Sequence, residues 1–229
     1  MAPILTFAMT AAITPGPNNI ILSTNAVNYG FKETIPLILG VFFGFLSVLS
    51  LCLLGIGEVY ESFPNFKTFI KIIATIFLTY LAYKIFNSSE FSDNSNKKRF
   101  TFRNIYFFQL INPKAVSVSM SSSAIFIQNQ FSYLEEFVLI FICFTISTAT
   151  SAIVWAAIGH SFRKYLNDKR KIIFFNRVMA VLLLGCIFFN EAPWQQLFPG
   201  VLLFVSAGFI IIWRDSQKIK TVKANKKFY

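Results

Sequence analysis

The chain is organised by runs of about twenty apolar residues, and this feature restricts its fold more than any other. A helix that crosses a bilayer core needs roughly 17–25 apolar residues. Six runs meet that length, and a seventh of 17 residues is at its lower limit: 3–27, 35–56, 66–86, 105–127, 137–159, 172–189 and 197–213. Continuously apolar runs favour helices over the alternating strands of a transmembrane barrel. We therefore expect an all-α, polytopic transmembrane bundle of six or seven helices.

The composition does not suit a water-exposed surface. Hydrophobic residues make up 55% of the chain and charged residues 14%, against about 25% charged in an ordinary soluble domain. The net charge of +11 lies in clumps between the apolar runs, instead of along one face as in a nucleic-acid-binding protein. We expect a multi-pass protein of the plasma (inner) membrane, in contact with lipid and without a nucleic-acid partner.

Basic and acidic loops alternate along the chain. The loops after the third and fifth runs and the C-terminal tail carry the basic clusters: Lys84, Lys97, Lys98, Arg99 and Arg103; Arg163, Lys164, Lys169, Arg170 and Lys171; and Arg214, Lys218, Lys220, Lys223, Lys226 and Lys227. The intervening loops carry Glu58 and Glu61, Glu135 and Glu136, and Glu191. Because loops rich in Lys and Arg stay in the cytoplasm, the pattern predicts seven spans, an external N-terminus and an internal C-terminus.

The runs group into a transport core and a C-terminal extension. Residues 1–189 form the predicted core, with halves at about 1–87 and 105–189 and a connector, 87–104, rich in Ser, Asn and charge. Residues 190–213 hold the predicted seventh helix, and residues 214–229 a basic cytoplasmic tail that we expect to bind anionic lipid. Self-association into a homo-oligomer stays open.

Proline and glycine interrupt the first and fourth predicted helices. Proline removes a backbone donor and clashes with the preceding turn, so both helices are predicted to be broken inside the membrane. The breaks fall in the first helix of each three-helix half. Because three spans end on the opposite side of the membrane from where they began, the second half would enter from the other side, and the halves would be inverted repeats. Interrupted helices at corresponding positions of two halves indicate a transport site. The predicted substrate-binding residues are Thr14, Pro15, Gly16, Pro17, Asn18, Asn19, Asn112, Pro113 and Lys114.

The residues at the breaks suit a small zwitterion. A half-helix N-terminus attracts a carboxylate, and carbonyls freed by a break suit an ammonium group. Asn18, Asn19 and Asn112 can both donate and accept. Lys114 is the cation beside the second break, and it could face the cavity or extend to the cytoplasmic surface. Two structural kinks in a passive bundle are the alternative interpretation.

Small residues indicate where helices pack closely. Gly40 and Gly44 form a GxxxG pair in the second run, and Ser117, Ser121 and Ala124 form a small stripe in the fourth. Such residues let helix backbones approach one another in a membrane. We expect both sets to make helix–helix contacts.

Signals of catalysis are missing from the sequence. It contains no HExxH, GxSxG or P-loop pattern, and no cluster of metal-ligand residues. Its three cysteines lie inside apolar runs without CxxC spacing. We expect a protein that is not an enzyme, with no metal and no cofactor. The spans also lack a buried Asp or Glu to carry protons. His160, the single histidine, or Lys114 could couple protons, or the protein could be a uniporter.

Several of these motifs together resemble the lysine exporter (LysE/RhtB) family of amino acid translocators, over about residues 5–189. The motifs are Thr14-Pro15-Gly16-Pro17-Asn18, Tyr29-Gly30-Phe31, Leu39-Gly40-Val41 with Gly44, and Asn112-Pro113-Lys114. Within the family, the pattern is most similar to the cysteine/O-acetylserine exporter branch, on Pro15-Gly16-Pro17-Asn18-Asn19-Ile20 and on Trp155-Ala156 with Gly159-His160 and Phe162. The resemblance implies an exporter with a hydrophobic helical bundle.

The prediction for function is a secondary transporter that exports small neutral amino acids or derivatives, of the cysteine, O-acetylserine, homoserine or threonine class, across the plasma membrane. A cationic substrate would need an anion in the cavity, and the spans offer none. The alternatives are a channel, a membrane scaffold that does not transport, and an exporter of a basic amino acid.

Overall fold

The computed structural model describes residues 1–56, 62–88, 100–128, 131–166 and 169–188, and within them every regular element is a helix. The predicted all-α class is therefore confirmed for this part of the chain. The predicted seventh helix, the basic tail and most of the connector lie outside the described residues.

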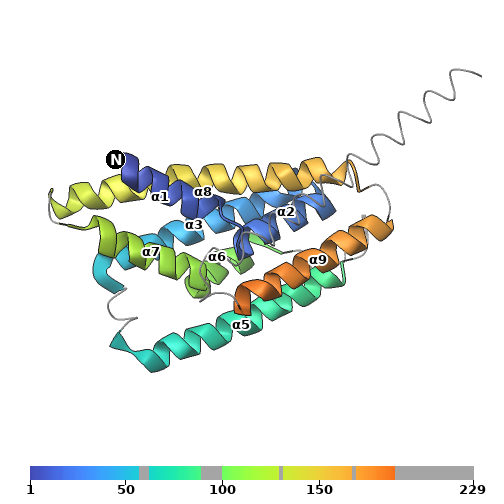
Figure 1. Ribbon diagram of the computed structural model, residues 1–229, viewed down its shortest axis with the longest axis horizontal. Coiled ribbons are helices and arrows are strands. Elements are labelled where there is room, and N and C mark those ends of the chain that lie inside the picture. The colour runs from blue at the N-terminus through green and yellow to red at the C-terminus, as the bar shows by residue number, and fades with distance from the viewer. Residues whose placement is uncertain (57–61, 89–99, 129–130, 167–168, 189–229) are drawn as a thin grey trace, which may run out of the picture. The chain divides into compact units, whose positions relative to one another are not determined.

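Two helices in tandem open each half of the chain (Figure 1). The described helices of the first half are α1 (Ala2–Ile13), α2 (Pro17–Tyr29), η1 (Lys32–Thr34), α3 (Ile35–Leu51), the π-helical turn η2 (Cys52–Ile56) and α5 (Pro64–Phe86). Those of the second half are α6 (Phe102–Ile111), α7 (Pro113–Phe126), α8 (Tyr133–Arg163) and α9 (Lys169–Phe188).

Three helical segments among the described residues are long and apolar enough to cross a membrane: Lys32–Ile56, Thr68–Phe86 and Tyr133–Arg163. The helices of the two tandem pairs, α1 with α2 and α6 with α7, are each shorter than a full span. Proline in the first turn starts α2 and α7, where its missing N–H has no intrahelical acceptor to lose. Proline thus both ends one helix of each pair and begins the next.

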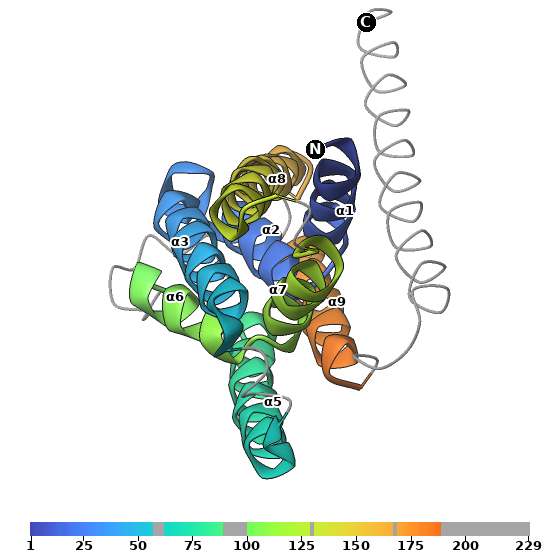
Figure 2. The same cartoon turned by 90° about the vertical axis from the view of Figure 1, so that its left-hand side faces the viewer.

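The long helices α8 and α5 lie on opposite sides of the bundle. In two views, α1 lies beside α8, and α9 lies beside α5, with α2 and α7 between these two sides (Figure 1, Figure 2). The apolar centre between α3, α7 and α8 is built around Phe45, Leu49, Ala115, Ile140 and Phe144. This core fixes the positions of the helices that carry the two breaks.

Glycines set the closest helix contacts. A Cβ at Gly40 would lie 2.8 Å from the Phe102 carbonyl oxygen, and one at Gly44 would lie 2.8 Å from that of Tyr106. The predicted GxxxG contact is therefore confirmed, and it joins α3 to α6. At Gly159 a Cβ would lie 2.3 Å from the Ser23 carbonyl oxygen, so α8 and α2 touch through their backbones.

The prediction that the stripe of small residues on α7 makes a helix–helix contact was wrong for the described part of the chain. Ser117, Ser121 and Ala124 are exposed, whereas the buried small residues of this helix include Ala115, Ser119 and Ser122. The fourth predicted span holds small or polar residues at many successive positions. More than one face of this helix therefore shows small residues three or four positions apart, and the sequence does not tell which face packs. The apolar partners on α3 and α8 select the face that packs.

The outer face of α5 is apolar, and no other helix among the described residues covers it. Its large exposed side chains include Phe69, Ile72, Ile76, Tyr80 and Tyr83, all more than half exposed. A continuous stripe of this size is not stable in water. It fits contact with lipid acyl chains, as the composition indicates.

Candidate functional site

The first break leaves several backbone carbonyls without helical partners. Helix α1 ends at Ile13, and Gly16, in extended conformation, precedes the first residue of α2. The last carbonyls of a helix have no intrahelical donor, and Pro15 and Pro17 lack the N–H groups that a continuous helix would offer to the Ala11 and Ile13 oxygens. The carbonyl oxygens of Ala12, Ile13 and Thr14 therefore need donors from elsewhere in the protein.

Side chains from α2 and α8 supply those donors. The Asn19 amide donates to the Ala12 oxygen at 3.0 Å and to the Thr14 oxygen at 2.7 Å. On α8, the Ser151 hydroxyl donates to the Ala12 oxygen at 2.7 Å. The Trp155 indole donates to the Ile13 oxygen at 3.1 Å. Protein side chains therefore donate to the carbonyl oxygens of Ala12, Ile13 and Thr14, and binding of a substrate ammonium at the break stays a prediction.

Lys114 takes one of these carbonyls with its ammonium group. Its Nζ donates to the Thr14 oxygen at 2.8 Å across the two halves of the chain. Of the two placements left open by the sequence, the structure shows the one that faces the cavity. A Cβ at Gly16 would lie 2.9 Å from Lys114 Cδ and 3.0 Å from Nζ, so glycine at this position makes room for the lysine.

Three amide side chains form a second bridge between the breaks. Asn18 and Gln109 exchange hydrogen bonds of 2.9 Å in both directions. The Asn112 amide donates to Asn18 Oδ1 and to Gln109 Oε1, each at 3.3 Å. Asn112 Oδ1 accepts the backbone N–H of Lys114 at 3.2 Å and so caps α7. The structure therefore brings the two predicted breaks into direct contact.

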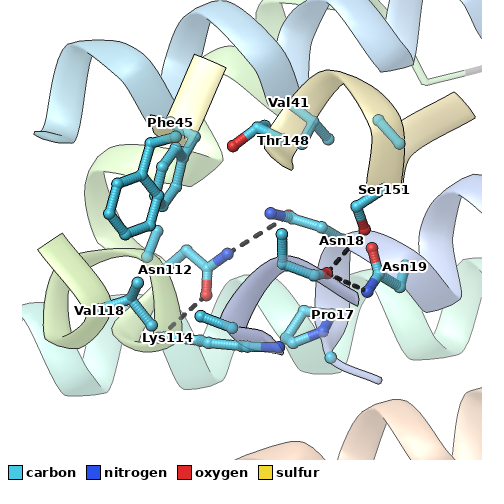
Figure 3. A pocket seen from close by; sticks show the side chains of 16 residues that line it. Pro17, Asn18, Asn19, Val41, Phe45, Asn112, Lys114, Val118, Thr148 and Ser151 are labelled. Carbon is cyan, nitrogen blue, oxygen red and sulfur yellow. Dashed lines mark hydrogen bonds between the residues drawn. The ribbon is translucent and has the colours of Figure 1, made fainter. Parts of the chain in front are cut away.

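A cavity lies where the breaks meet, with a volume of about 50 Å³ (Figure 3). At about 10–15 Å³ of such space for each water, it holds a few waters or a small solute. Its lining residues are Ala11, Ala12, Gly16, Pro17, Asn18, Asn19, Val41, Phe45, Asn112, Lys114, Ala115, Val118, Phe144, Thr148, Ser151 and Ala152. Amide, hydroxyl and ammonium groups thus share this cavity with apolar side chains.

Six of the nine predicted binding residues line the cavity: Gly16, Pro17, Asn18, Asn19, Asn112 and Lys114. Thr14 takes part through its carbonyl oxygen, whereas Pro15 and Pro113 shape the chain without lining the space. The backbone N–H groups of Asn18 and Asn19 belong to the first turn of α2 and have no intrahelical acceptor. The geometry therefore combines a cation, helix N-terminal donors and amide groups around one small space.

Sequence reasoning missed four polar residues at the site: Gln109, Thr148, Ser151 and Trp155. Gln109 lies three residues before Asn112, and a glutamine inside an apolar run is a signal that could have identified it. Ser151 and Trp155 are one helical turn apart on α8, so they share a face. That face became recognisable only once α8 was known to pack on α1.

His160 lies away from the cavity. It is exposed, its ring is 6.5 Å from that of Phe31, and it does not line the cavity. Twelve residues separate it from Thr148 on the same straight helix, which is about 18 Å of axial rise. A proton-coupling role for His160 stays a prediction. Among the described residues, no group of three or more His, Cys, Asp or Glu side chains could hold a metal ion.

A helical bundle with an apolar outer face and a polar cavity between two broken helices belongs to the class of membrane transporters. Residues 9–189 match the family described as LysE type translocator, and the chain belongs to that family. It is a translocator rather than an enzyme.

Curated relatives cover most of the chain. A protein from Shigella flexneri serotype 5b (strain 8401), named cysteine/O-acetylserine efflux protein, is 26% identical over 192 residues, which cover 81% of this chain and 97% of the relative. A protein of the same name from Escherichia coli (strain K12) is 25% identical over 182 residues, or 79% of this chain and 92% of the relative. No solved structure matches the chain.

Proposed function

We propose that this protein exports small neutral amino acids of the cysteine and O-acetylserine class across the plasma membrane. The observation that carries the proposal is the contact between the Lys114 ammonium and the Thr14 carbonyl oxygen, at 2.8 Å, on the wall of the cavity between the two breaks. The names of the relatives, cysteine/O-acetylserine efflux protein, support the substrate class.

A zwitterion can exchange partners with this contact. Lys114 occupies the position at Thr14 that a substrate ammonium would take. When an amino acid enters, its carboxylate attracts Lys114 and its ammonium group replaces the lysine at the Thr14 oxygen. A buried charge without a partner is costly, and the exchange leaves every charge paired. The N–H groups of Asn18 and Asn19 can add donors to the carboxylate.

The same lysine selects against cationic substrates. A second positive charge about 6 Å from Lys114 Nζ costs about 3 kcal/mol at an effective dielectric constant of about 20. That energy corresponds to roughly a hundredfold loss of affinity. The described residues that line the cavity include no carboxylate that could offset it. Lysine and arginine are therefore expected to be poor substrates.

Two inverted three-helix repeats would give this site its alternating access. In the two halves, α1 corresponds to α6, α3 to α8, and α5 to α9. Helix α1 packs on α8, and α6 packs on α3 in the same way. Helices α3 and α8 also pack on each other, as do α5 and α9. These contacts support an inverted arrangement. Rocking of one repeat against the other would expose the breaks to each side in turn. With the alternation of loop charges, we propose seven spans and a cytoplasmic C-terminus.

Efflux from proteoliposomes tests the proposal. Vesicles loaded with labelled cysteine or O-acetylserine should lose label faster than protein-free vesicles, whereas lysine should be exported more slowly than either. Lys114→Met should lower the rate by roughly 10–100-fold, as expected for loss of a hydrogen-bonded charge. The variant should stay folded because Asn19 still donates to the Thr14 oxygen.

The matched control is Lys71→Met, on the exposed side of α5, which should leave the rate unchanged. Faster export of lysine than of neutral amino acids would contradict the proposal. A passive scaffold predicts no efflux, and a channel predicts a rate that does not saturate with substrate concentration.

A further inference from the structure

A second cavity, of about 30 Å³, lies further along α2 and away from the breaks. Its lining residues are Ile21, Thr24, Asn25, Asn28 and Tyr29 of α2, Lys84 and Ile85 of α5, and Ser88 and Phe100. Thr24 follows Asn19 by five residues, which places the two cavities about 8 Å apart along the helix axis. Helix α2 therefore lines both cavities, one near its start and one near its end.

Within the described part of the chain, no group forms a hydrogen bond with the hydroxyl group of Thr24, although Thr24 is only 3% exposed. A buried hydroxyl left unpaired is destabilising, and such groups are rare in folded proteins. Ser119 carries the other fully buried hydroxyl without a partner among the described residues, but it lines neither cavity. Thr24 thus combines a fully buried, unpaired hydroxyl with a place on the wall of a cavity.

The groups around Thr24 complement an amino acid zwitterion. The Asn25 amide donates to Thr34 Oγ1 at 3.0 Å and to the Glu33 carbonyl oxygen at 3.4 Å, which leaves its own oxygen as an acceptor for an ammonium group. Lys84 lines the same cavity, and its ammonium lies 4.0 Å above the centre of the Phe100 ring. A cation and neutral acceptors around one small space suit the carboxylate and the ammonium group of one amino acid.

A buried amide pair holds the neighbouring wall in place. Asn28 and Asn176 exchange hydrogen bonds of 2.9 Å in both directions. Asn176 also donates to the Ser88 carbonyl oxygen at 2.6 Å, so one pair ties α2 and α9 to the end of α5. The side of the cavity at Asn28 and Ser88 is therefore held by hydrogen bonds between α2, α9 and the end of α5.

From these groups we infer that the second cavity is a loading site for the transported amino acid on the side where it enters. The carboxylate faces Lys84, and the ammonium group binds the Thr24 hydroxyl and the Asn25 oxygen. Lys84 begins the basic loop that the charge pattern places in the cytoplasm, so this side is the cytoplasmic one. The inference rests on the proposed export of amino acids and adds a second position on the same path.

Transport measured separately at each face tests the inference. In inside-out vesicles, labelled O-acetylserine added outside meets the cytoplasmic face, and in right-side-out vesicles counterflow reports the external face. Thr24→Val removes the hydroxyl and keeps the shape, so it should raise the half-saturation concentration at the cytoplasmic face by roughly three- to tenfold. The external value should stay unchanged. Thr24→Ser should behave like the wild type, and Lys84→Gln should raise the cytoplasmic value as well.

Ser119→Ala is the matched control, because it removes the other unpaired buried hydroxyl, and it should leave both faces unchanged. A Thr24→Val variant with wild-type half-saturation at the cytoplasmic face would overturn the loading site and leave the export function intact. An equal change at both faces would also overturn it. A wild-type protein that moves no neutral amino acid would instead overturn the export function on which the loading site depends.

Discussion

Gly159→Ala should destabilise the contact between α8 and α2. The new Cβ would lie 2.3 Å from the Ser23 carbonyl oxygen and 2.8 Å from its Cα. Both are backbone atoms, so the helices themselves must move. Overpacking of this kind costs about 1–3 kcal/mol, and a rigid backbone neighbour points to the upper end. The better helix propensity of alanine returns about 1 kcal/mol, so we expect a net loss of about 2 kcal/mol.

For a chain of this size, such a loss lowers the melting temperature by about 4–8 °C. Thermal unfolding in one detergent, at one scan rate, measures it, because an irreversible transition depends on the rate. Ala157→Ser, at an exposed position of the same helix, adds one atom without the clash and should melt like the wild type. A Gly159→Ala protein that melts at or above the wild-type temperature would refute the backbone contact.

Three further predictions concern other parts of the molecule. Gly44→Val should lower the melting temperature of the protein, because the side chain would overlap the Tyr106 carbonyl and Gln109; an unchanged value would count against the contact of α3 with α6. Trp155→Phe removes the donor to the Ile13 oxygen and should cost about 1 kcal/mol of stability, measured by the same melt; no loss would mean that another group caps this carbonyl. In intact cells, a C-terminal tag should be inaccessible to an external probe and an N-terminal tag accessible, and the reverse labelling would contradict the topology.

The helix breaks could be predicted from sequence because their cause is local. Proline removes a donor wherever it occurs, so Pro17 and Pro113 start new helices without help from the rest of the chain. The contact between the two breaks could also be predicted from the sequence, because breaks at corresponding positions of two related halves are expected to lie at one shared site. The donors at the broken ends were not predictable in this way. Trp155 and Ser151 lie about 140 residues beyond the carbonyls they bind, and no local pattern connects such distant positions.

The second limit on prediction from the sequence concerned which face of each helix is buried. The placement of Gly40 and Gly44 succeeded because glycine has few reasons to recur at this spacing other than close packing. Serine and alanine are common on every face of a membrane helix, so the stripe of Ser117, Ser121 and Ala124 carried little information about which face is buried. The side chain of Lys114 illustrates the same limit, since its long stem could reach either the cavity or the surface.

In the proposed function, side chains that stabilise the first break are also ones that the substrate contacts. Asn19 and Lys114 donate to the Thr14 carbonyl oxygen, and both line the cavity. Asn19 alone would keep this oxygen paired, so it is the lysine ammonium that needs the contact, because a charge buried without a partner is costly. With the Thr14 oxygen as its acceptor, Lys114 stays paired between substrates, and in the proposed function a zwitterion can take its place because the zwitterion also provides the lysine with a carboxylate. A solute with an ammonium group alone provides no such partner, so the pairing itself favours amino acids over simple amines.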